Sequence, residues 1–336
     1  MTARAEQLQT FLTLAGWGQA KRRPLAGDAS NRRYERLAHS NGTRAVLMDA
    51  PPSKGEDIAP FIKLAEYLSR SDLSAPDLFA RDVHNGFLLL EDLGDDLFAR
   101  VLEDDLTQEA KLYAAATDTL IDLHIKAPPK SLQHYGPDIM AEAACLALDW
   151  YATHADGPVS AADRAILHDL VHTQLEETFP QKQVTVLRDY HAENLLWLPN
   201  RAGLRRVGLL DFQDAMLGHP AYDLASLLHD ARRDVSDATR TACIERYVSA
   251  TGHPKETFAL GYAACSAQRN LRIMGVFARL CIRDGKPGYP DLMPRVWANL
   301  TRDLAHPDLS DLAGFVENHI PEPTPQIIAK IKSHHA

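Results

Sequence analysis

The chain has 336 residues, of which 45% are hydrophobic and 24% are charged, which is typical of a soluble globular protein with two sizeable cores. Its formal net charge of −9 disfavours a general binder of nucleic acid or of anionic membranes. Its 15 histidines lack metal-ligand spacing and its 4 cysteines form no CxxC pair, so neither a zinc site nor a disulfide framework is expected. We expect a cytoplasmic protein with no nucleic-acid, membrane or obligate protein partner.

Strand signals dominate the first 92 residues. Residues 1–20 have the spacing of an amphipathic helix and indicate no signal peptide. Two strands follow in "RRYERLAHSNGTRAVLMDAPP", around an Asn41-Gly42 turn, and "PLAGDASN" before them has the composition of a flexible loop. A helix over 58–70 and two strands in "DLFARD" and "FLLLEDLG" complete the segment. These elements predict a small antiparallel β lobe.

Helical periodicity dominates the chain after the expected linker at Glu91–Leu97, and it is clearest over 107–126. One strand-rich island interrupts it, with a hairpin formed by Leu195–Leu198 and Arg206–Leu210. The fold class is therefore α+β with two lobes, an ATP-binding lobe at 1–92 and a larger helical lobe at 93–336 that carries catalysis and substrate binding. Further helices are expected at 138–153, 160–178, 221–234, 237–250, 256–283, 290–304 and 323–333.

The island "VTVLRDYHAENLLWLPNRAGLRRVGLLDFQDA" carries groups that phosphoryl transfer requires. Such a reaction needs a carboxylate to orient a hydroxyl, hard oxygen ligands for Mg²⁺, and donors that hold phosphates. Asp189 lies on a loop after an apolar run, and Asn194 closes that loop. Asp211 ends the second hairpin strand, so we expect it near Asn194. Amide and carboxylate oxygens suit Mg²⁺ better than zinc.

The motif "RDYHAEN" followed by "LLDFQDA" resembles the catalytic loop and metal-binding aspartate of the aminoglycoside phosphotransferase family. The downstream "HPAYDLASLL" is similar to that family's next helix start, whereas "LR" stands where the family carries "HG". The resemblance implies a protein-kinase-like fold with ATP and Mg²⁺ as cofactors. It implies that Asp189 is the catalytic base and that Asn194 and Asp211 are the Mg²⁺ ligands.

Within that family, the chain most resembles the bacterial anomeric kinases of N-acetylmuramate and N-acetylglucosamine. The matching stretches include "GDASNRRYERL", "GFLLLEDLG" and "FARLCIRDGKPGYP". This resemblance implies a small sugar and ATP as binding partners, and a role in cell-wall recycling. Two alternatives stay open: a kinase of cationic aminoglycosides or another small alcohol, and a catalytically weak pseudokinase.

The expected nucleotide site departs from the kinase pattern at one position. Kinase-like proteins usually bind ATP phosphates with a strand lysine paired to a helix glutamate, but Met48 and Phe61 stand at those positions. An arginine of "SNRRYER", Arg32 or Arg33, is the expected replacement, with Lys54 as a weaker candidate. The remaining expected nucleotide contacts are backbone groups of the loop with Gly27 and Ser30, and of the hinge with Glu91 and Leu93.

Other polar residues are candidates for supporting roles. We expect His191 to brace the catalytic loop and Asp223 to cap free N–H groups at a helix start and so hold that loop. Asp214 would contact metal or substrate, or else be a solvated turn residue. Three arginines, Arg269, Arg272 and Arg279, recur along the helix at 256–283, either as a solvated face or as a pocket wall that attracts an anionic substrate.

Overall fold

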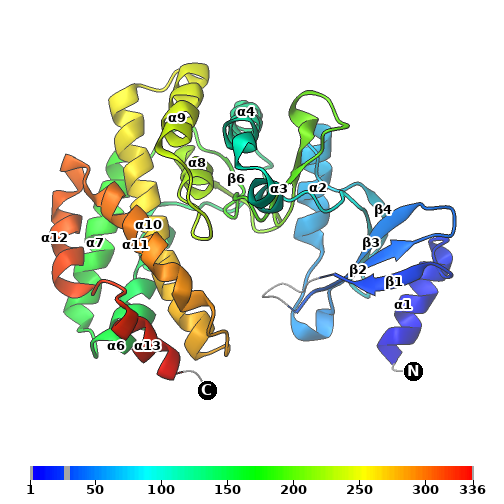
Figure 1. Cartoon of the computed structure of the whole chain (residues 1–336), viewed down its shortest axis with the longest axis horizontal. Helices are drawn as coiled ribbons and strands as arrows, with labels where there is room; N and C mark the ends of the chain where they lie inside the picture. The colour runs from blue at the N-terminus through cyan, green and yellow to red at the C-terminus, as the bar shows by residue number, and fades with distance from the viewer. Residues whose placement is uncertain (1–2, 26–30, 335–336) are drawn as a thin grey trace. The chain divides into compact units, whose positions relative to one another are not determined.

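The computed structural model describes residues 3–25 and 31–334, and its elements form two compact units (Figure 1). Unit 1 contains Met1–Asp104 and Glu193–Ala215, and unit 2 contains Asp105–Ala192 and Met216–Ala336. The chain therefore passes between the units inside the strand-rich island, so Asp189 belongs to unit 2 whereas Asn194 and Asp211 belong to unit 1. The proposed lobe boundary between residues 92 and 93 stays a prediction.

Unit 1 contains a five-stranded antiparallel sheet of order β1-β2-β3-β5-β4. The predicted hairpin turn is confirmed, because the amide of Gly42 donates to the carbonyl of His39 at 3.0 Å and Gly42 has a φ of 88°. The strand β1 was not predicted, because all four of its residues are exposed and carry no apolar alternation. The strands are β1 (Lys21–Pro24), β2 (Arg33–Ala38), β3 (Arg44–Asp49), β4 (Leu78–Asp82) and β5 (Phe87–Glu91).

Helices and a second hairpin complete unit 1. In α1 (Ala3–Leu14) the predicted apolar face is buried against the sheet, with Leu12 packing in one cluster with Leu37 and Leu47 (Figure 1). The short helix η1 (Pro52–Lys54) precedes α2 (Ala59–Arg70), whose predicted inward residues are all buried. The expected linker after β5 is followed at once by α3 (Phe98–Asp104). The hairpin consists of β7 (Leu195–Trp197) and β8 (Val207–Leu209), joined through η4 (Gly203–Arg206).

Unit 2 is mainly helical. Its one small sheet pairs β6 (Val184–Val186) with β9 (Met216–Gly218), and β9 was not predicted. Its elements in chain order are η2 (Leu106–Gln108), α4 (Glu109–Ile125), α5 (Pro137–Ala144), the π-helical η3 (Ala147–Ala152), α6 (Thr153–Ala155), α7 (Ala161–Thr178), α8 (Ala221–Leu228), α9 (Asp237–Thr251), α10 (Lys255–Ile282), η5 (Tyr289–Leu292), α11 (Met293–Leu304), η6 (Pro307–Leu309), α12 (Ser310–His319) and α13 (Pro325–Ser333).

Two expected helices of unit 2 differ from the structure. The helix expected over 138–153 contains a π-helical segment between α5 and α6. The helix expected over 221–234 ends at Leu228, because the carboxylate of Asp230 accepts a hydrogen bond from the amide of Arg232 at 2.8 Å and so favours a turn. The helix α12 was not predicted.

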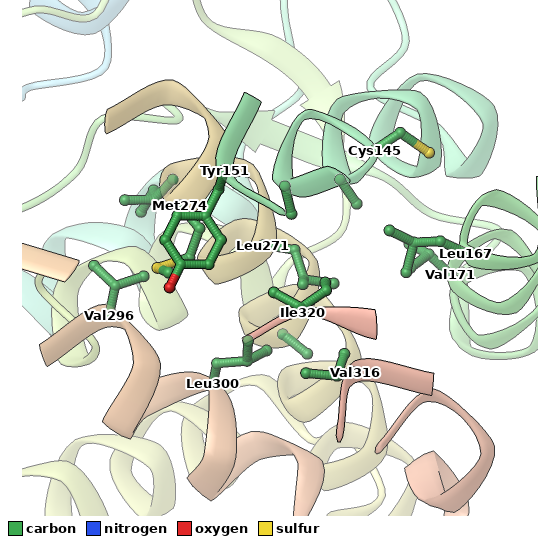
Figure 2. Close-up of a cluster of buried hydrophobic side chains, with 14 of the residues drawn as sticks. Cys145, Tyr151, Leu167, Val171, Leu271, Met274, Val296, Leu300, Val316 and Ile320 are labelled. Atoms are coloured by element: carbon green, nitrogen blue, oxygen red, sulfur yellow. The ribbon is translucent and has the colours of Figure 1, made fainter. Parts of the chain in front are cut away.

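The core of unit 2 is built around α10, whose buried residues lie on all its faces. Figure 2 shows Leu271 and Met274 of α10 among Tyr151, Val296 and Leu300. The helix also approaches other backbone closely: a Cβ atom at Gly275 would lie 2.1 Å from the carbonyl oxygen of Leu146. None of the helices in the described ranges is long and apolar enough to cross a membrane.

Candidate active site

The loop with Asp189 begins where β6 ends, and one buried carboxylate holds its backbone. Asp223 accepts hydrogen bonds from the amides of Leu187, at 2.6 Å, and Arg188, at 2.8 Å. This confirms that Asp223 holds the catalytic loop, but the N–H groups that it satisfies belong to the loop and not to the start of α8, whose N-cap, Pro220, makes no side-chain cap. Burial raises the pKa of Asp223 to about 7, although both amide donors favour its charged form.

Asp189 is surrounded by positive charge. The Nη2 atom of Arg269 lies 3.9 Å from its Oδ1 atom. Burial alone would raise the pKa of Asp189, but the charges of Arg269 and Arg272 outweigh burial and lower the pKa below its usual value. The side chain is therefore an ionised hydrogen-bond acceptor at neutral pH, as a group that orients a hydroxyl must be.

The residues after Asp189 are fixed from within unit 2. The hydroxyl of Tyr190 donates to the carbonyl of Ala116 at 2.9 Å, and the amide of Ala192 donates to Oδ2 of Asp230 at 3.3 Å. Between them His191 is buried, and burial lowers its pKa to about 4, so the imidazole is neutral at pH 7. A neutral buried ring is compatible with a bracing role, which stays a prediction. The sequence analysis did not identify Asp230.

In unit 1, the hairpin brings Asn194 and Asp211 together, which confirms their expected proximity. Leu195 pairs with Leu209, and the Nδ2 atom of Asn194 donates to Oδ2 of Asp211 at 3.5 Å. The other carboxylate oxygen of Asp211 accepts from Nε2 of Gln213 at 2.7 Å, a partner that the sequence analysis missed. Asp211 has a φ of 54°, and such a left-handed conformation of a non-glycine residue is often found at functional sites.

These donors fit a magnesium ion better than a transition metal. In the described ranges, no group of three or more His, Cys, Asp or Glu side chains could hold a metal. One carboxylate and one amide oxygen suffice for Mg²⁺, which usually keeps waters and takes further ligands from substrate phosphates. Asp214 is exposed on the turn after Asp211. Metal binding by Asn194 and Asp211, and any contact by Asp214, stay predictions.

Two apolar residues stand where kinase-like proteins usually carry the phosphate-binding lysine and its glutamate partner. Met48 is fully buried in β3, and Phe61 of α2 is 5% exposed. The ring of Phe61 lies 4.9 Å from the ring of Phe212, the residue after Asp211. Glu66 instead forms an exposed ion pair with Arg81 at 3.0 Å. An aromatic contact therefore connects α2 to the segment of Asp211. The residues of the usual lysine–glutamate ion pair are absent from this sequence.

The two candidate replacements for the lysine differ in their surroundings. Arg32 donates from Nε to Oε2 of Glu56 at 2.8 Å, and both side chains are only 12% exposed. Arg33 is exposed at the start of β2, and Lys54 is exposed in η1. Gly27 and Ser30 lie outside the residues that the structure describes. Arg32 is thus the more buried of the two arginines, and which residue replaces the lysine stays a prediction.

The expected adenine-binding hinge contains Glu91, whose backbone amide and carboxylate make other contacts in unit 1. The amide of Glu91 donates to the carbonyl of Asp77 at 2.8 Å, and its carboxylate binds Arg201. This amide is therefore committed within unit 1, and an adenine contact through other backbone groups near Glu91 stays a prediction. Leu93 lies beside the hairpin, 3.3 Å from where a Cβ atom of Gly208 would be. An adenine contact through Leu93 stays a prediction.

The three arginines of α10 have different roles in the packing. Arg269 is buried and donates from Nη1 to the carbonyl of Arg188 at 2.9 Å. Arg272 is half-buried and interacts electrostatically with Tyr222 and with Asp189. Arg279 has a pKa lowered by burial and next by the charge of neighbouring Arg283. Arg269, Arg272 and Arg279 therefore do not form one uniform basic surface.

The fold is that of small-molecule kinases. A choline/ethanolamine kinase family protein from Mesorhizobium loti superposes with a TM-score of 0.61 at 12% identity, covering 98% of this chain and 99% of that chain. A thermostable mutant of the aminoglycoside phosphotransferase APH(4)-Ia gives a TM-score of 0.59 at 14% identity, covering 88% of this chain and 99% of that chain. At these identities the likeness shows a kinase-like α+β fold.

Sequence comparison then assigns the family. Residues 21–263 match the phosphotransferase enzyme family, and the chain belongs to it. A protein of Caulobacter vibrioides named N-acetylmuramate/N-acetylglucosamine kinase is 39% identical, over 94% of this chain and 96% of its own length. A protein of Pseudomonas aeruginosa with the same name is 35% identical, over 92% of this chain and 95% of its own length. The expected kinase class of enzyme is thereby confirmed.

Proposed function

We propose that this enzyme transfers the γ-phosphoryl group of ATP to the anomeric hydroxyl of N-acetylmuramate and N-acetylglucosamine. The observation that carries the chemistry is the ionised Asp189 carboxylate, kept charged by Arg269 and Arg272 in spite of burial. The sugar is suggested by the relatives from Caulobacter and Pseudomonas, which are named for these two substrates. Because ATP is the donor, the proposal includes a cytoplasmic location.

In this reaction the residues have separate tasks. Asp189 accepts a hydrogen bond from the anomeric O–H and takes its proton as that oxygen attacks phosphorus. The new O–P bond replaces the bond to the bridging oxygen, and ADP leaves with that electron pair. An anomeric hydroxyl is more acidic than an ordinary alcohol, so a carboxylate of low pKa is a sufficient base. Asn194 and Asp211 would hold Mg²⁺, which neutralises phosphate charge when bound.

Two alternative functions make different demands. A kinase of cationic aminoglycosides needs a negative substrate site, whereas three arginines surround Asp189 here. A pseudokinase has no use for a hydroxyl-orienting carboxylate, although the apolar Met48 and Phe61 positions would suit one.

Coupled measurement of ADP formation with N-acetylmuramate, N-acetylglucosamine, kanamycin and choline tests all three functions. We expect sugar-dependent turnover with both N-acetyl sugars and little or none with kanamycin. A higher kcat/KM for kanamycin than for either sugar would reject the proposal, and ATP binding without turnover of any acceptor would favour a pseudokinase.

A further inference from the structure

A cluster of arginines and buried tyrosines lies beside Asp189, with members from four segments of unit 2. The guanidinium carbon of Arg188 lies 5.1 Å from the centre of the Tyr135 ring. The hydroxyls of Tyr135 and Tyr222 are 3.3 Å apart, and their rings meet edge to face at 5.1 Å. Arg272 of α10 acts electrostatically on both Tyr135 and Tyr222. Arg188 and Arg272 are only half-buried, whereas both tyrosines are 2% exposed or less.

We propose that Arg188 and Arg272 form a subsite for a substrate carboxylate, and that this subsite favours N-acetylmuramate over N-acetylglucosamine. The inference rests on the proposed function, because it names the groups that would select between its two sugars. The two substrates differ by the lactyl ether at O3 of N-acetylmuramate, which carries the only carboxylate in either molecule. O3 and the anomeric oxygen are attached to the same sugar ring, so the carboxylate of a bound sugar stays close to the residue that orients the reacting hydroxyl.

The charge balance of the cluster favours an anion. Arg188, Arg269 and Arg272 all act electrostatically on Asp189 and on Tyr222. Arg269 is already used by the protein, since it donates to the carbonyl of Arg188 and lies beside Asp189. Arg188 and Arg272 are half-buried, and both act electrostatically on Asp189. A carboxylate would neutralise part of the positive charge of the three arginines, and guanidinium groups bind carboxylates through two parallel hydrogen bonds.

The backbone at Arg188 indicates that this side chain is retained for a reason. Its φ of 72° lies in the left-handed region, where glycine is favoured and a long side chain is strained. Only Asp72 and Asp211 share this feature among the non-glycine residues of the described ranges. A strained residue next to the proposed base fits a functional constraint. The tyrosine ring beneath the guanidinium supports its orientation by a cation–π contact.

The decisive experiment compares the two sugars in single variants. Arg188→Gly removes the guanidinium and places glycine where the backbone favours it, so loss of folding is not expected. Arg272→Met removes the second cation at similar length. For each variant we expect the kcat/KM for N-acetylmuramate to fall roughly ten- to a hundredfold relative to that for N-acetylglucosamine, as loss of a charged hydrogen bond predicts. Arg283→Met, on the exposed end of the same helical segment, is the control and should leave the ratio unchanged.

Two outcomes would overturn the subsite. Equal losses for both sugars would show that the arginines act on the transferred phosphoryl group or on the loop, and an unchanged ratio would show that the carboxylate is bound elsewhere. Calorimetric titration of the enzyme with N-acetylmuramate, without ATP, separates the subsite from the proposed reaction. If the wild type binds this sugar and Arg272→Met binds it at least tenfold more weakly, the subsite stands even where turnover of either sugar fails.

Discussion

The guanidinium of Arg269 contacts two consecutive residues, Arg188 and the proposed base Asp189. Its Nη1 donates to the carbonyl of Arg188 at 2.9 Å, and its Nη2 lies 3.9 Å from Oδ1 of Asp189. The backbone of the same loop is also held by Asp223, which accepts from the amide of Arg188. One buried cation therefore holds the backbone of Arg188 and, together with Arg272, lowers the pKa of Asp189 in spite of burial.

This relationship predicts a shift in the pH profile of the enzyme. The activity requires the Asp189 carboxylate, and the charge of Arg269 lowers the pKa of that group. Arg269→Met removes the charge, so the acid limb of kcat/KM for the neutral N-acetylglucosamine should move to higher pH. Arg269→Lys keeps the charge and should restore most of the wild-type profile. A lower kcat with an unmoved acid limb in Arg269→Met would show that Arg269 only supports the loop.

Removing the proposed base should affect turnover far more than nucleotide binding. Asp189→Ala is expected to lower kcat by roughly 10² to 10⁴, the usual contribution of a general base or orienting carboxylate. The affinity for ATP, measured by calorimetry with Mg²⁺ present, should stay close to that of the wild type. A variant that keeps more than about a tenth of the wild-type kcat would exclude Asp189 as the base.

The parts of the site that could be predicted depend on local patterns. Asn194 and Asp211 flank a two-strand hairpin, and strand pairing alone brings them together. That Asp223 holds the catalytic loop was expected, but the amides that it binds, on Leu187 and Arg188, lie 36 and 35 positions away and leave no signal in the spacing of apolar residues. The same is true of the Arg188–Tyr135 contact and of β9, whose three residues pair with β6 across the whole island. Long-range contacts of polar groups thus had to come from the structure.

The replacement of the missing lysine can be tested in unit 1. Arg32 is largely buried beside Glu56, whereas Arg33 is exposed. We expect Arg32→Met to raise the KM for ATP several-fold or more, because a charged hydrogen bond to phosphate contributes about 1.5–3 kcal/mol. Arg33→Met, the matched neighbour, should have little effect. Equal and small effects of both substitutions would favour Lys54 or backbone donors instead.

Removal of either proposed metal ligand should change how the activity depends on the Mg²⁺ concentration. Asn194→Ala and Asp211→Ala each remove an oxygen donor, so the concentration of Mg²⁺ that gives half-maximal activity should rise in both variants. Gln213→Ala removes the hydrogen bond to Oδ1 of Asp211 and should cause a smaller shift, since it orients a ligand rather than supplying one. Magnesium titration curves of Asp211→Ala that superpose on the wild type would rule out this site.

Asp223 should make the enzyme's stability depend on pH in an unusual direction. Burial raises its pKa from 3.8 to about 7 in the folded protein. Between these values the folded state holds a proton on Asp223 that the unfolded chain has released. The stabilisation from this group is therefore fully present below about pH 4 and is lost as the pH rises towards 7. The change amounts to a few kcal/mol, on the order of 1.4 kcal/mol for each pH unit between the two pKa values.

Asp223→Asn isolates this effect. Buried histidines such as His124 and His219 have lowered pKa values and act in the opposite direction, since they destabilise the fold as the pH falls. They are present in both proteins, so they cancel when the two free energies of unfolding are subtracted. The amide also leaves one of the N–H groups of Leu187 and Arg188 without its acceptor, a cost that does not change with pH. Urea unfolding between pH 4.5 and 7.5 should therefore show a wild-type advantage that shrinks as the pH rises, and a constant difference would mean that Asp223 does not titrate in this range.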